Sequence, residues 1–322
     1  MSSLNGGSLN KNPPNADRHI TLGGTNWLWA VFAVMAVSTL GMIAWTFNRG
    51  KHPLPNFERN ANRFVVQRRR GTRFFHNIAL VILATSTVAY FSMASDLGAT
   101  PITAEFSRGN TGTRQIWYVR YIQWFITFPL LLMLLLFSTG LSLSDILTTM
   151  FFAWIVVVCG LVGALTASTY KWGFFALGVA ALFYIWSSLL GHGPRTHFNA
   201  GSGVRSGYVR GSGLVVFITM LYPIAWGCSE GGNVISPTRE MIWYGVLDLI
   251  LGPLFLYYFL FRLRSVDYGT FGFHSGKYTD GEYGQGGAGG AGPNMTSHGA
   301  GMGGGNVGAG PGVGGHEASS VV

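Results

Sequence analysis

The sequence predicts an all-α membrane protein, organised as a bundle of seven transmembrane helices. Only 10% of its 322 residues are charged, whereas ordinary soluble domains carry about 25%. Hydrophobic residues make up 48% of the chain and aromatic residues 14%. A soluble surface of this size needs many more ionised side chains, so the composition argues against a soluble enzyme.

Seven apolar runs, taken with their flanks, are long enough to cross a hydrocarbon core about 30 Å thick. Backbone polar groups in lipid must be paired within their own segment, so each run is expected to be a helix. Pro129, Pro223 and Pro253 predict kinks in three of them, which packed neighbours tolerate. The predicted spans are Trp27–Phe47, Phe74–Ala94, Ile116–Phe137, Ile146–Ala167, Phe174–Leu190, Leu214–Cys228 and Met241–Phe261.

Two polar segments flank the predicted membrane domain, which covers residues 23–265. Residues 1–22 have no apolar stretch of the kind found in cleaved signal peptides, and they are expected to form a polar extracellular tail. Residues 266–322 are rich in Gly, Ser, Tyr and Ala. Such a segment cannot bury enough apolar surface to offset the entropy lost on ordering, so a disordered cytoplasmic tail is predicted.

Basic residues in the loops predict the orientation in the membrane. Fourteen of the 21 Lys and Arg residues are expected on one side, including Arg195, Arg205 and Arg210 in the fifth loop, and six on the other. This asymmetry predicts an outside N-terminus and a cytoplasmic C-terminus. The run Arg68–Arg70 is interpreted as a topology anchor that contacts membrane lipids, so the net charge of +9 does not call for nucleic acid.

Cysteine and histidine usage gives no sign of a disulfide framework or a metal centre. Cys159 and Cys228 both lie in or beside apolar runs, and the eight His residues lack close ligand spacing.

Charges inside membrane spans are expensive and therefore mark candidate functional residues. Arg120 and Asp248 are two such charges, and Arg120 shares one helix face with Gln123, Trp124 and Thr127 at spacings of three and four residues. If the third and seventh helices pack together, Arg120 and Asp248 lie at similar depth. A structural ion pair between them and a role in moving protons or ions are then equally favoured.

Two acids, Glu230 and Glu240, bracket the loop before the seventh span on the predicted outer side. Near an outward-facing Arg they would share a proton and change each other's titration. Exposed loop carboxylates without a special role are the favoured interpretation. Aromatic residues expected in the interior are Tyr90, Trp124, Tyr222 and Trp226, for which core packing is more common than ligand contact.

Several ordered motifs resemble those of the microbial (type I) rhodopsins, over essentially all seven spans. Residues 120–131 resemble the family's third-helix signature Arg-Tyr-x-Asp-Trp-x-x-Thr-x-Pro-Leu-Leu, with Gln123 in place of the acid. Residues 160–166 resemble the end of its fourth helix. Tyr222-Pro223-x-x-Trp226 with Ser229-Glu230-Gly231 resembles the sixth helix and outer loop, and Leu247-Asp248 the seventh.

The departures from this resemblance bear on function. The family's retinal-binding Lys lies four residues after the seventh-helix Asp, a position held here by Gly252, so covalent retinal attachment is not expected. Gln123 replaces the counterion acid, Leu134 the proton donor of the pumps, and Thr219 a chromophore-packing Trp. The resemblance therefore implies a pocket without its light chemistry, and no light-driven pump.

The resemblance divides the candidate residues into two groups. The retinal-pocket-like remnant comprises Tyr90, Gln123, Trp124, Thr127, Tyr222, Trp226, Asp248 and Gly252, and the buried charge network comprises Arg120, Asp248, Glu230 and Glu240. The space left by the lost lysine is expected to be filled by Phe255 or neighbouring aromatic side chains, because native cores rarely leave large voids. A sterol, a fatty acid or non-covalent retinal is the alternative occupant.

This combination resembles the fungal opsin-related proteins, which include small membrane heat-shock proteins. The resemblance implies a non-enzymatic plasma-membrane protein, associated with stress and acting as a regulator or chaperone-like partner of membrane proteins such as the proton ATPase. The oligomeric state is left open, since many rhodopsins form homo-oligomers. An ion-conducting or lipid- or sterol-binding protein is the alternative, and a photoreceptor with non-covalent retinal ranks last.

Overall fold

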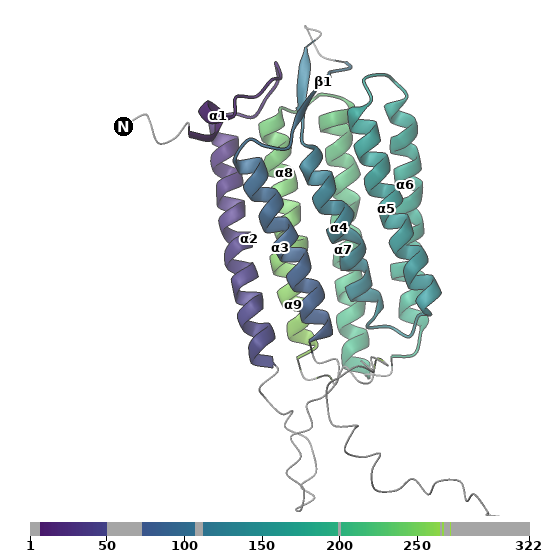
Figure 1. The fold of residues 1–322 in the computed structure, drawn as a ribbon. Helices are drawn as coiled ribbons and strands as arrows, with labels where there is room; N and C mark the ends of the chain where they lie inside the picture. Colours follow the sequence, from purple (N-terminus) through teal and green to yellow (C-terminus); the bar gives the residue numbers. More distant parts are fainter. Residues whose placement is uncertain are drawn as a thin grey trace, which may run out of the picture. The chain divides into compact units, whose positions relative to one another are not determined.

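The computed structural model describes residues 7–49, 73–106, 112–198, 201–264, 266 and 271. Within these ranges seven helices are long and apolar enough to cross a membrane, which confirms the predicted seven-helix bundle. They run side by side in Figure 1. The orientation in the membrane stays a prediction, and the run Arg68–Arg70 and the Gly-rich residues 272–322 lie outside the described residues.

The bundle is built from consecutive helices that pack against their neighbours in the chain, α2 on α3, α3 on α4, α4 on α5 and α5 on α6. The first long helix also packs on α8, which closes the ring. The helices are α1 (Gly7–Lys11), α2 (Leu22–Arg49), α3 (Phe74–Ala94), α4 (Tyr118–Leu136), α5 (Leu143–Leu165), α6 (Lys171–Ser187), α7 (Ser202–Trp226), α8 (Pro237–Leu249) and α9 (Phe255–Arg262). Short segments extend them, namely the π-helical η1 (Ser188–His192), η3 (Gly227–Gly231) and η4 (Ile250–Leu254) and the 3-10 turn η2 (Gly193–Arg195).

The sixth span begins well before its predicted start at Leu214. Helix α7 starts at Ser202, so Arg205 and Arg210 lie in a helix and not in the predicted loop. The reason is packing, because this half of α7 is rich in Gly and Ser but buries Val204 and Tyr208. The Tyr208 hydroxyl donates a hydrogen bond to the carbonyl of Leu189 at 2.9 Å, which ties α7 to the end of the preceding span.

A small β-hairpin joins α3 to α4, an element that the all-α prediction did not include. Strands β1 (Thr100–Thr103) and β2 (Thr113–Ile116) are antiparallel, with Thr100 opposite Ile116. The hairpin stands at the same end of the bundle as α1 in Figure 1, and we refer to it as the hairpin end.

The N-terminal segment packs on this hairpin. Its Arg18 backbone pairs with β2, donating to the carbonyl of Thr113 and accepting from the amide of Gln115, both at 2.9 Å. Ile20 is fully buried, and its amide donates to the Gln115 side chain at 3.0 Å. Residues 16–20 therefore form part of the folded hairpin end, a role that their polar composition did not reveal.

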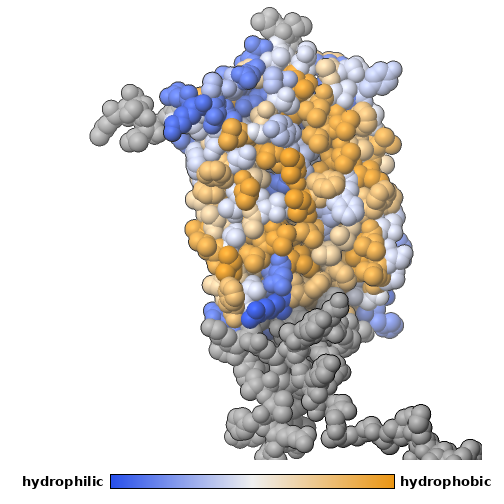
Figure 2. Space-filling model, in the orientation of Figure 1, coloured by the Kyte–Doolittle hydropathy of each residue, from blue (hydrophilic) through white to orange (hydrophobic). Residues whose placement is uncertain are grey.

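Hydrophobic side chains cover most of the bundle wall on the side shown in Figure 2. Exposed hydrophobic residues of the long helices include Val37, Leu40, Val88, Leu147 and Leu177. In lipid these side chains meet hydrocarbon, so this exposure fits a multi-pass membrane protein.

Asp17 makes docking of the N-terminal segment pH-dependent. Its Oδ2 accepts from the Thr113 amide at 2.8 Å and from the Thr113 hydroxyl at 3.0 Å, and these bonds hold the pKa of the carboxyl below its ordinary value of 3.8. Because the folded-state pKa is lowered, this contribution is complete above pH 3.8 and is lost as the pH falls through the folded-state pKa. Asp17→Asn is expected to speed amide hydrogen exchange in residues 16–20 at neutral pH, with little further effect in acid. Equal acceleration at both pH values would contradict this account.

Candidate functional site

The inward face of α4 carries the polar side chains predicted for it. Arg120, Gln123 and Thr127 are all buried, whereas Ile122 and Ile126, one position away, face outward. The spacing of three and four residues places the first three on one side of the helix. This face meets α3, α7 and α8 in the centre of the bundle.

A cavity of about 130 Å³ lies beside this face. Its wall includes seven of the eight residues predicted as the pocket remnant, which are Gln123, Trp124, Thr127, Tyr222, Trp226, Asp248 and Gly252. Thr219, at the position of the chromophore-packing Trp, also lines it and accepts a hydrogen bond from the Trp186 indole at 3.0 Å. The eighth predicted residue, Tyr90, contacts Asp248 and does not line the cavity.

The expectation that Phe255 fills this space is wrong. Phe255 is buried, but it stacks on Phe259 with ring centroids 5.7 Å apart and lies against Gly211. The ring therefore occupies the α7–α9 contact and is not among the residues around the cavity. A Cβ atom built at Gly252 would meet only Met35, at 3.5 Å, so a side chain there is not excluded by its immediate neighbours.

Asp248 is held by four uncharged donors. The hydroxyls of Tyr222 and Tyr90 donate to it at 2.5 and 2.7 Å, the Trp124 indole at 3.1 Å and the Gln123 amide at 3.3 Å. The two oxygens receive two bonds each, which matches the lone pairs of a carboxylate. Three different helices thus converge on one buried acid. We call these five residues the Asp248 cluster.

The structural ion pair between Arg120 and Asp248, one of two equally favoured interpretations, does not form. Arg120 donates instead to Glu240 at 2.6 Å and lies 4.0 Å from Glu230. Both acids are nearer the hairpin end than Asp248, because Glu240 stands in the first turn of α8 and Glu230 in η3. Side chains of α4 do reach Asp248, through the Gln123 amide and the Trp124 indole. Arg120 instead reaches toward the hairpin end.

The favoured interpretation of Glu230 and Glu240 as exposed loop acids is also wrong. Both are buried, with 3% and 0% of their surface exposed. Glu240 accepts from Arg114 as well as Arg120, each at 2.6 Å, and Glu230 accepts a hydrogen bond from the Tyr121 hydroxyl. These residues, Arg114, Arg120, Tyr121, Glu230 and Glu240, form what we call the hairpin-end cluster.

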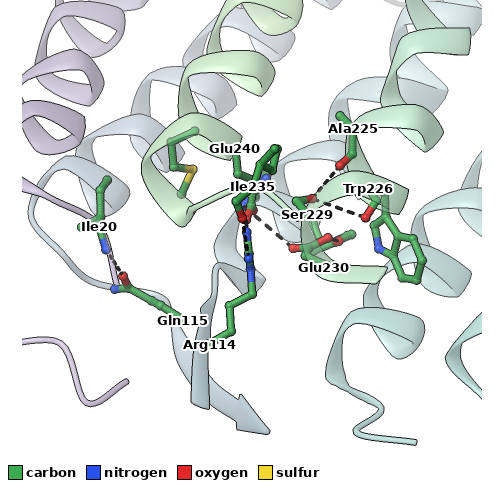
Figure 3. Close-up of polar contacts among 12 residues, drawn as sticks. Ile20, Arg114, Gln115, Ala225, Trp226, Ser229, Glu230, Ile235 and Glu240 are labelled. Carbon is green, nitrogen blue, oxygen red and sulfur yellow. Dashed lines mark hydrogen bonds and ion pairs between the residues drawn. The ribbon is translucent and has the colours of Figure 1, made fainter. Parts of the chain in front are cut away.

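Arg114 enters this cluster from the β-hairpin, as Figure 3 shows. Its guanidinium also donates to the carbonyl of Ile235 at 2.8 Å and to the side chain of Asn233 at 3.2 Å. Ser236 caps α8 by accepting from the amide of Arg239, and Pro237 follows as the first helical residue. The start of α8 therefore places Glu240 near a helix N-terminus, which favours its negative charge.

Sequence reasoning missed three residues of the site. Arg114 is not among the predicted candidates, and neither are Tyr121 and Tyr244, both of which line the cavity wall. The available signal for Tyr121 was its place in the third-helix motif, directly after Arg120. Arg114 gave no such signal, because its burial depends on a hairpin that docks across the end of the bundle.

Comparison with known proteins agrees with this geometry. A family model of bacteriorhodopsin-like proteins matches residues 61–255. Protein FDD123 of Trametes versicolor is 59% identical over 273 residues, covering 85% of this chain and 89% of that protein. A 30 kDa heat shock protein of Saccharomyces cerevisiae is 34% identical, covering 79% and 76% of the two chains.

A solved structure gives the same result for the fold. The light-driven proton pump rhodopsin of Coccomyxa subellipsoidea superposes with a TM-score of 0.65 at 29% identity, covering 76% of this chain and 98% of that one.

Proposed function

The chain belongs to the bacteriorhodopsin-like family, and from that premise we propose a non-photochemical, non-enzymatic membrane protein that acts through contacts with other proteins. The observation that carries this proposal is Gly252. It lines the cavity where the family attaches its chromophore, and no lysine is among the described residues of the cavity wall. Without an amine there, retinal has no nucleophile with which to form a Schiff base.

The name of one relative bears on the setting in which these contacts are made. One is named a heat shock protein, which supports association with stress. We propose that the chain resides in the plasma membrane and regulates or protects other membrane proteins, with the proton ATPase as the first partner to test. Deletion is expected to change proton-ATPase activity and survival after heat stress, and co-purification before and after stress reports the partner. If deletion changes neither, this function is wrong.

A spectrum tests the loss of light chemistry directly. Purified protein incubated with all-trans-retinal is expected to show no new visible band, because neither Gly252 nor Gln123 supplies a Schiff-base nitrogen or its counterion. The comparison variant is Gly252→Lys with Gln123→Asp, which introduces both groups. A visible band in the unmodified protein would contradict the proposal.

A second candidate function is the binding of a small molecule in the cavity. The observation that favours it is the remaining volume of about 130 Å³, lined mostly by apolar and aromatic side chains. An engineered cavity of about 150 Å³ binds benzene, so a ligand of one ring fits this volume whereas a sterol or a retinoid is far larger. Mass spectrometry of extracts from the purified protein would detect such a ligand.

Ion conduction has less support. Leu134, at the position of the pumps' proton donor, is fully buried in the apolar core. At the hairpin end, two arginines and two glutamates pair with one another within the described bundle. We expect voltage-clamp recordings to show no current above background.

A further inference from the structure

Asp248 is a buried carboxylate without a cation. Its four hydrogen-bond donors are all neutral, and no described Lys, Arg or His lies within the 4.0 Å ion-pair distance of its oxygens. Arg120, the described cation on the same inward face of α4, is taken by Glu240 at 2.6 Å. The four hydrogen bonds satisfy the acceptor sites of Asp248 but leave its charge without a counter-ion. A buried charge is stabilised by a partner of opposite sign.

A second acceptor lies beside it. Gln123 is 2% exposed, and its amide nitrogen points to Ser86 and Asp248, both at 3.3 Å. Its Oε1 is buried and has no hydrogen-bond partner among the described residues. Native proteins rarely leave such an atom unpaired, and an unpaired buried acceptor marks a place where a donor is missing.

Both side chains line the same cavity, and its remaining wall is suited to an apolar body. Trp124, Tyr222 and Phe175 present aromatic surface there, and Gly252 adds no side chain. Aromatic faces attract ammonium groups as well as hydrocarbon. The cavity thus combines two neighbouring acceptors, Asp248 and the Oε1 of Gln123, with aromatic side chains along the rest of its wall.

We propose that this cavity binds a compact organic amine, one ring with a short arm that ends in an ammonium group. The ammonium has donors only, so it would pair with Asp248 and donate to Gln123 Oε1, while the ring packs against Trp124 and Tyr222. A neutral alcohol would satisfy Gln123 but leave Asp248 without a cation. This inference rests on the second candidate function proposed above and names the class of its ligand.

The test uses the full chain in lipid nanodiscs with three probes of similar shape, benzylamine, benzyl alcohol and toluene. Calorimetry gives each dissociation constant, and Trp fluorescence reports binding beside Trp124. Benzylamine is expected to bind about tenfold or more tightly than benzyl alcohol, because hydrogen bonds to charged groups are stronger. Asp248→Asn is expected to abolish this preference, and Asp145→Asn, which removes an exposed acid, to leave it unchanged.

The outcomes separate this inference from the proposal on which it rests. If amine and alcohol bind equally, the amine class is wrong and the cavity remains a ligand site. If no probe binds, both the amine proposal and the proposal of a small-molecule site are wrong. If Asp248→Asn fails to fold, Gln123→Met decides, because it removes the unpaired oxygen and keeps the volume. Gln123→Met is expected to weaken the binding of benzylamine and to leave the affinity for toluene unchanged. An unchanged benzylamine affinity would overturn the proposal.

Discussion

Replacing Glu240 by leucine is expected to lower the free energy of unfolding by about 3–5 kcal/mol, the usual effect of removing one partner of a buried ion pair. Glu240 is fully buried and is the closest anion to both Arg114 and Arg120. The variant would leave two buried guanidinium groups with only Glu230, which lies 4.0 Å from Arg120. Reversible unfolding of the reconstituted protein by detergent titration, followed by circular dichroism, measures the difference.

The control for this prediction is Asp145→Asn. Asp145 is an exposed acid in the first turn of α5, where its carboxylate accepts from the Ser142 hydroxyl at 2.7 Å. Its loss is expected to lower the free energy of unfolding by no more than about 1 kcal/mol. If Glu240→Leu has an equally small effect, the hairpin-end cluster does not stabilise the fold as described.

Phe255→Ala is expected to lower the free energy of unfolding by about 3–5 kcal/mol as well, but through a cavity in the core. The Phe255 ring is 1% exposed, stacks on Phe259 and lies against Gly211. Because it packs between α7 and α9, we expect the affinity for benzylamine to stay unchanged. The same detergent titration and the same calorimetry measure both quantities.

This pair of readouts distinguishes the observed packing from the collapsed pocket predicted by the sequence. If Phe255 filled the cavity, its removal would open binding space and change ligand affinity. A changed affinity together with a small loss of stability would contradict the packing in the structure.

The helices were largely predictable because hydropathy alone requires them. Residues 74–94 were predicted to the residue, since that span is mostly apolar, contains no Asp, Glu, Lys or Arg, and is followed by the polar residues Ser95 and Asp96. The start of α7 was not predicted, because residues 202–212 are too weakly hydrophobic to be recognised as part of a span. That half is helical through the burial of Tyr208 and its bond to Leu189.

The site was predictable where it follows one helix and unpredictable where it joins several. Periodicity placed Arg120, Gln123 and Thr127 on one face, and the structure agrees. It could not give the partner of Arg120, since that depends on which side chains of α8 and the hairpin lie at the same depth. The sequence offered Asp248 as a charge of opposite sign, but Glu240 stands nearer.

The pairing of Glu240 with both arginines also constrains how the chain assembles. Glu240 lies 126 residues after Arg114 and 120 after Arg120, in the last of the seven spans. Arg120 enters the membrane with the third span, before its principal anion has been synthesised. The unfinished bundle therefore carries an inadequately paired cation in hydrocarbon until α8 arrives. Insertion of the final helix is consequently the step that completes the hairpin end, and a chain truncated before residue 237 would lack the anion that Arg114 and Arg120 share.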